Sequence, residues 1–142
     1  MTRAGAYGQS FALKHLSDGR YDEALAEADK QIAADPKDPE PVLDRAQILM
    51  ALERFEDTVA EVERALELDR AAEVLDDSVV DDTLFSTLVA WGRTVADSDP
   101  KRAAALFDIY KKLVPQGVHK GEAAEWARRF QGERRMWVKE QE

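Results

Sequence analysis

One stretch of this sequence returns after 34 residues, and this spacing limits what the chain can fold into. The segment Gly19–Leu25 is matched by the segment Glu53–Val59, with Tyr21 and Phe55 at equivalent positions. An internal period of this length is typical of stacked helix-turn-helix units, each of which buries its apolar face only against its neighbour. The repeat therefore favours a helical binding scaffold over an enzyme.

The spacing of apolar residues predicts two helix pairs over the repeated region. We expect helices at about 5–17 and 21–34 in the first pair, and at about 40–52 and 55–69 in the second. Gly19 suits the left-handed turn that ends many helices, and the prolines of the segment 35–39 stop the first pair. The small residues Ala12, Ala24 and Ala46 would let paired helices approach closely, while Tyr21 and Phe55 would fill the gap between pairs.

These residues resemble a known family. The motif Gly19, Tyr21, Ala24 and Leu25, with the ending Asp35-Pro36, is similar to the signature of tetratricopeptide repeats, and the resemblance covers two copies from Gly5 to Asp69. The family implies a right-handed superhelical stack of helix pairs. The sequence departs from the family pattern at a few positions. Gly8 and Val42 replace a common tryptophan, and Phe11 and Arg45 replace a common leucine. Arg70 replaces the proline that would end the second repeat.

A third pair is present, but it is displaced by 11 residues from the 34-residue period. We expect its helices at about 82–96 and 101–113, with Ser98 or Asp99 as the cap and Pro100 in the first turn. A last helix at about 120–139 carries an apolar stripe, which is typical of a solenoid cap; the stripe consists of Ala123, Trp126, Ala127, Phe130 and Trp137.

The predicted fold is therefore all-α: a single domain with three helix pairs and a C-terminal capping helix. The boundaries are about 5–38, 39–72 and 82–115 for the three repeats, and 119–140 for the cap. The extra residues at 71–81 either extend the preceding helix or form a loop, and the helix-forming residues at their start favour the extension.

The resemblance implies that the first helix of each pair lines a concave face. The residues that we expect there are mostly apolar, which suits an amphipathic helix or an extended peptide: Gln9, Leu13, Leu16, Leu43, Gln47, Met50, Phe85 and Leu88. Alternatively, these residues pack between helices, or the C-terminal helix fills the groove. The family's clamp for the C-terminus of heat-shock chaperones needs basic residues where this chain has Gln9, Leu13 and Asp44, so that role is disfavoured.

Composition narrows the class of partner. The net charge of −9 argues against a nucleic-acid ligand, no apolar run is long enough to span a bilayer, and no cysteine is present.

We expect a cytoplasmic adaptor that binds a peptide or helix of another protein; the alternative is a self-associating module of a larger complex, such as a homodimer. The acidic run at 73–82 and the arginines of the last helix are either solvated faces or contacts for charged partners.

Catalytic chemistry has little support in the sequence. His15 and His119 fall in different elements, and neither has a cysteine or carboxylate at metal-ligand spacing. No glycine-rich phosphate loop or nucleophile motif is present. We therefore predict a protein that is not an enzyme, with no catalytic residues, no metal and no cofactor.

Overall fold

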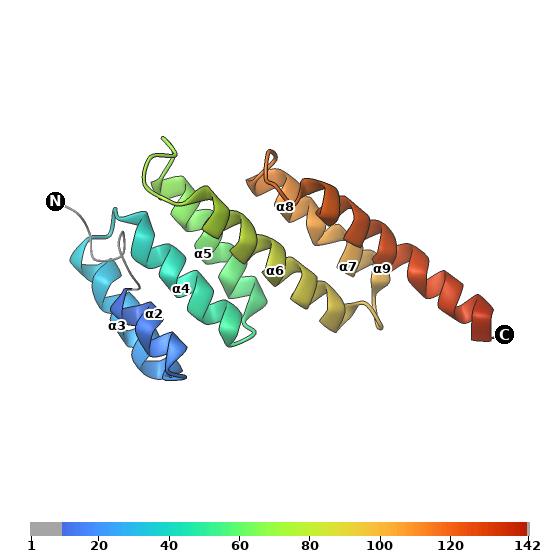
Figure 1. Cartoon of the computed structure of the whole chain (residues 1–142), viewed down its shortest axis with the longest axis horizontal. Coiled ribbons are helices and arrows are strands. Elements are labelled where there is room, and N and C mark those ends of the chain that lie inside the picture. Colours follow the sequence, from blue (N-terminus) through green and yellow to red (C-terminus); the bar gives the residue numbers. More distant parts are fainter. Residues whose placement is uncertain (1–9, 142) are drawn as a thin grey trace. The chain divides into compact units, whose positions relative to one another are not determined.

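The described part of the protein is built from helices alone. A computed structural model describes the backbone of residues 10–141 and the side chains of residues 10–132. Within that range every regular element is an α-helix, so the all-α prediction is confirmed (Figure 1). The chain divides into two compact units, Met1–Asp76 and Asp77–Glu142, which are described separately.

The first unit consists of two antiparallel helix pairs. They are formed by α2 (Phe11–Ser17) with α3 (Tyr21–Ala34), and by α4 (Pro39–Ala51) with α5 (Phe55–Leu68). Helix α4 packs against both α3 and α5, which joins the two pairs (Figure 1). The predicted bounds of α3 are correct, and those of α4 and α5 are correct to within one residue.

The start of the first helix differs from the prediction. Helix α2 begins at Phe11 because the side chain of Ser10 caps it, accepting a hydrogen bond from the backbone N–H of Leu13 at 3.2 Å. The helix was expected from Gly5, and the residues before Ser10 lie outside the described part of the chain. The described first helix is therefore shorter than its counterpart α4.

The turn that ends α2 is repeated, bond for bond, after α4. In the first turn the N–H of Arg20 bonds to His15 C=O and the N–H of Gly19 bonds to Leu16 C=O. The second turn has the same two bonds 34 residues later, from Arg54 to Leu49 and from Glu53 to Met50. This is the Schellman arrangement, which needs a left-handed residue just after the helix.

The left-handed position holds glycine in one copy and glutamate in the other. Gly19 has a φ of 76° and Glu53 a φ of 60°, and Glu53 carries a Cβ that makes this conformation unfavourable. Replacing Glu53 with glycine should therefore raise the free energy of unfolding of the first unit by about 0.4–1 kcal/mol, measurable by urea denaturation. As the matched control, Ala60→Gly, at an exposed position inside α5, should lower it by about 0.5–1 kcal/mol. A loss of stability in Glu53→Gly would contradict the strain argument.

Alanines fill the places of closest helix approach in the first unit. Ala12, Ala24 and Ala28 form a buried cluster with Ile48, and Leu16, Leu25 and Leu52 pack against it. Ala46 is also fully buried, as expected for a residue that lets helices approach closely. The expectation for Tyr21 is wrong: its side chain is 41% exposed.

The residues after α5 form a loop and not a helical extension. Helix α5 ends at Leu68, and Asp69 accepts hydrogen bonds from the backbone N–H groups of Glu73, Val74 and Leu75 at 2.9–3.3 Å. Those bonds replace the ones that a continued helix would make, and Ala72 adopts a left-handed φ of 55°. The favoured prediction of an extended helix is therefore wrong.

The second unit contains four helical segments in its described part. They are α6 (Asp77–Val95), α7 (Pro100–Ala105), α8 (Phe107–Leu113) and α9 (Lys120–Gln141). Helix α6 begins five residues before the predicted start. Asp99 caps α7 as expected, accepting a hydrogen bond from the N–H of Arg102 at 3.0 Å, and Pro100 occupies the first turn. The helix expected at 101–113 is interrupted at Leu106, which keeps helical angles, and α9 packs against both halves.

Candidate functional site

The predicted contact residues of the first unit lie on α2 and α4, which contact each other. Leu16 packs against the alanine cluster, and Leu43 is buried with 3% of its surface exposed. Leu13, Gln47 and Met50 are half-buried and keep exposed surface. Gln9 lies outside the described residues. Leu16 is half-buried as well, so four of the predicted contact residues of the first unit keep exposed surface and Leu43 does not.

The predicted contact residues of the second unit are buried. Phe85 is 9% exposed and Leu88 is fully buried, both on α6. The ring of Phe85 stacks on His119, with centroids 4.4 Å apart, and meets Tyr110 edge-on at 6.2 Å. Both side chains present almost no surface to a partner, and Phe85 serves the packing of its own unit.

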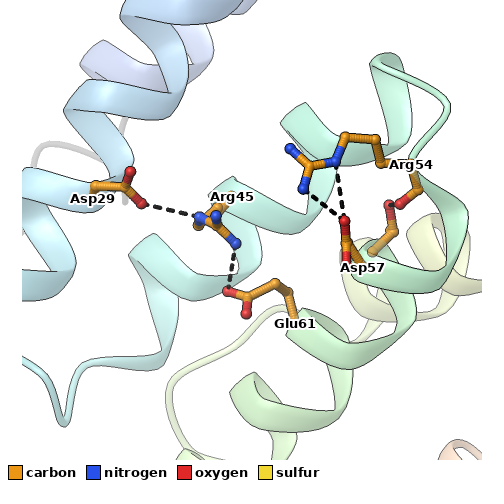
Figure 2. Close-up of polar contacts among 6 residues, drawn as sticks. Asp29, Arg45, Arg54, Asp57 and Glu61 are labelled. Carbon is orange, nitrogen blue, oxygen red and sulfur yellow. Dashed lines mark hydrogen bonds and ion pairs between the residues drawn. The ribbon is translucent and has the colours of Figure 1, made fainter.

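Arg45, one of the departures from the family pattern, joins three helices of the first unit by ion pairs. From α4 its guanidinium lies 3.0 Å from Asp29 on α3 and 3.7 Å from Glu61 on α5 (Figure 2). A separate pair joins Arg54 and Asp57 within the second repeat at 2.7 Å. The central guanidinium is 27% exposed, so its two carboxylate contacts hold the helices in register more than a fully solvated pair would.

The second unit contains a buried polar cluster around Asp81, on α6. The hydroxyl of Tyr110 donates to Asp81 at 2.5 Å and accepts from the backbone N–H of His119 at 2.9 Å. The second oxygen of Asp81 accepts from the N–H of Val118 at 2.6 Å. Burial raises the pKa of the Tyr110 phenol above its ordinary value, and the bond to Asp81 raises this pKa further. The cluster fastens the loop before α9 onto α6 and α8.

His119 lies between two carboxylates. Its Nε2 is 2.8 Å from Asp82 on α6 and its Nδ1 is 3.0 Å from Glu122 on α9. The bond to Asp82, followed by the bond to Glu122, raises the pKa of this imidazole, because both favour the charged ring. The sequence analysis considered carboxylates near this histidine only as metal ligands, whereas here two carboxylates contact the imidazole itself. The spacing of Glu122 was visible in the sequence, but Asp82 lies 37 residues away and only folding brings it close.

This arrangement predicts a pH dependence of stability. A folded-state pKa above the unfolded value means that the stabilisation is fully present below the unfolded pKa, near 6.5, and is lost as pH rises through the folded pKa. The free energy of unfolding of the second unit, measured by urea denaturation, should therefore fall as the pH rises above about 6.5. The fall should be about 1 kcal/mol or less, because both carboxylates are exposed to solvent. His119→Gln should remove this slope; an unchanged slope in the variant would assign it to another group.

A protein family model matches most of the first unit. The family model described as tetratricopeptide repeat matches residues 15–76, and its match ends at the boundary of that unit. Residues 15–76 are thus similar to tetratricopeptide repeats. No curated protein matches the chain. Tetratricopeptide repeats mediate protein–protein interactions and are typically not enzymatic.

Beyond the tetratricopeptide repeat segment, α9 carries the expected apolar stripe. Ala123 is buried, and Trp126, Ala127 and Phe130 are half-buried, whereas Trp137 lies outside the described side chains. Phe130 packs against Phe107 of α8, with centroids 5.9 Å apart. Gly92 of α6 makes room for this ring, since a Cβ there would lie 2.6 Å from it. The stripe therefore faces the other helices of the second unit.

Neither a metal site nor a membrane-spanning helix is found in the part of the chain that the structure describes. Its His, Asp and Glu side chains form no group of three or more that could hold a metal ion. Its helices are too short or too polar to cross a bilayer.

Proposed function

We propose that this chain is a protein–protein interaction adaptor whose tetratricopeptide repeats bind a peptide or amphipathic helix of a partner. The observation that carries the proposal is the position of Leu13, Gln47 and Met50. They keep exposed surface on two contacting helices of the first unit. In this family the first helices of successive pairs line a concave face, which matches α2 and α4.

Charge favours a partner with a basic polar face. Residues 1–76 contain 18 Asp and Glu but nine Lys and Arg, so the first unit accounts for a net charge of −9, whereas residues 77–142 contain 11 of each. Opposite charges raise the rate of encounter and exclude wrong partners. We therefore expect an amphipathic helix whose apolar side packs on Leu13 and Met50 and whose polar side carries Lys and Arg.

The test is a double substitution on this surface. Leu13→Gln with Met50→Gln should reduce the capture of partners from a lysate of native cells at least tenfold, because each apolar anchor contributes about 1.5–3 kcal/mol when buried. The readout is quantitative mass spectrometry of captured proteins. Leu43 is unsuitable for this test, since a polar group at a 3% exposed position would unfold the unit.

The matched control places the same change on the second helices of the two pairs. Ala26→Gln with Ala60→Gln alters two exposed positions that are 34 residues apart, and capture should be unchanged. Circular dichroism of all variants checks that helicity is kept. Equal loss in both double variants, or no loss in the first, would count against the proposed surface.

The second candidate is a self-associating module. It is favoured by Phe11 and Tyr21, whose side chains are 68% and 41% exposed in the first unit. Light scattering over a concentration series separates the two functions. A monomer at high concentration supports the adaptor, whereas dimerisation that Phe11→Ser abolishes supports self-association.

A further inference from the structure

Trp126 of the second unit is in contact with two arginines from different helices. The guanidinium of Arg93, on α6, lies 4.9 Å from the ring centroid, and that of Arg129, one turn along α9, lies 5.5 Å from it. Trp126 is half-buried, whereas Arg93 and Arg129 are exposed. We call these three side chains the Arg–Trp face.

Among residues 10–132, one carboxylate lies within ion-pair distance of the Arg–Trp face. Within the described side chains, the closest carboxylate is that of Glu125, 3.7 Å from Arg129 and itself 57% exposed. No ion pair joins Arg93 to a carboxylate in residues 10–132. Two guanidinium groups on one ring lie at most about 10 Å apart and repel each other, and a negatively charged ligand would reduce that repulsion.

The geometry suits carboxylates that arrive as a pair. A guanidinium that contacts an aromatic ring can still donate from its N–H groups to a carboxylate, and tryptophan and arginine are both enriched among the residues that dominate binding energy. In an extended peptide, alternate side chains point the same way and lie about 7 Å apart. This spacing falls within the separation allowed for the two arginines.

We propose that the Arg–Trp face is a docking site for an extended acidic peptide segment with carboxylates at alternate residues. One carboxylate binds Arg93, the next binds Arg129, and the peptide between them packs on the indole of Trp126. This site is separate from the surface on α2 and α4. The acidic first unit has the wrong charge to bind such a peptide, so the second unit is its target.

The test is fluorescence anisotropy with a labelled synthetic peptide in which glutamate alternates with threonine. The full chain should bind this peptide, with an affinity that falls as salt is added, and should not bind the same peptide with glutamine in place of glutamate. Arg93→Gln and Arg129→Gln should each weaken binding roughly tenfold. Arg93→Lys should have a smaller effect, because it keeps the charge and loses only the planar donor geometry.

Arg102→Gln is the matched control, since Arg102 lies 5.9 Å from a different tryptophan, Trp91. That variant, and Leu13→Gln with Met50→Gln, should bind the peptide as the unchanged chain does, so this proposal and the adaptor proposal fail independently. Thermal melts check that the arginine variants stay folded. Absent binding, equal binding of the glutamine peptide, undiminished binding by Arg93→Gln with Arg129→Gln, or tighter binding of a single-stranded oligonucleotide would each overturn the proposal.

Discussion

Asp69→Ala should lower the free energy of unfolding of the first unit by about 3 kcal/mol. The carboxylate is 9% exposed and accepts hydrogen bonds from three consecutive backbone N–H groups, the shortest being 2.9 Å from Leu75. Alanine leaves those donors without a partner in a loop whose Leu75 is buried, and each buried unsatisfied donor costs about 1–3 kcal/mol. Urea denaturation gives the free energy.

Hydrogen exchange localises the effect of this substitution. The amides of Glu73, Val74 and Leu75 should lose protection in Asp69→Ala, whereas the amide of Asp35, the equivalent residue one repeat earlier, should exchange as before. Asp69→Asn is the conservative variant, and it should cost less because one amide oxygen still accepts. Unchanged protection at all three amides would refute the role assigned to this carboxylate.

The same carboxylate predicts that the free energy of unfolding of the first unit falls at acid pH. Burial raises the pKa of Asp69, but the bonds from Leu75, Glu73 and Val74 lower it more, so the folded pKa lies below the ordinary value of 3.8. A lowered folded pKa means that the stabilisation is present above the unfolded pKa and is lost as pH falls through the folded pKa. In Asp69→Asn, the free energy of unfolding of the first unit should depend less on pH in the acid range.

Gly117→Ala should lower the free energy of unfolding of the second unit by about 3 kcal/mol, at the upper end for overpacking. An added Cβ would overlap the hydroxyl oxygen of Tyr110 and lie 2.7 Å from its Cζ and 3.0 Å from a carboxylate oxygen of Asp81. The ring of Tyr110 is 1% exposed and packed, so it cannot move aside without breaking its bond to Asp81. The buried carboxylate would then lose a partner.

A double-substitution cycle with Tyr110→Phe isolates this contact. Phenylalanine removes the hydroxyl that the Cβ would overlap, so Gly117→Ala should cost less in that background than alone. Gly121→Ala, at an open position in α9 where an added Cβ meets nothing, is the matched control and should be neutral or slightly stabilising. Strict additivity of the two changes would show that the hydroxyl is not the obstacle.

The local features of the first unit were predictable because they depend on neighbours in sequence. The 34-residue period, the glycine at 19 and the Asp-Pro stop predicted α3, α4 and α5 closely. The loop after Asp69 was not predictable in this way, since its residues favour a helix. The side chain of Asp69 offers their backbone N–H groups an alternative acceptor, and this competition is decided by the fold.

The features of the candidate sites depend on contacts between distant residues. Arg45 stood out as a departure from the family, but its pairing with Asp29 and Glu61 needs three helices in place. The family resemblance implied that both Leu13 and Leu43 are contact residues, yet one is half-buried and the other is 3% exposed. A hydrophobic pattern identifies which face of a helix is apolar, but the depth of each side chain depends on how its neighbours pack.

The left-handed glutamate at 53 bears on how such repeats diverge. The turn has the same two hydrogen bonds and a left-handed φ although it holds glutamate where glycine would suit this conformation best. Helix packing on both sides therefore holds the backbone in a shape that the local sequence no longer prefers. Where neighbouring helices define a turn in this way, glycine is not required at its left-handed position.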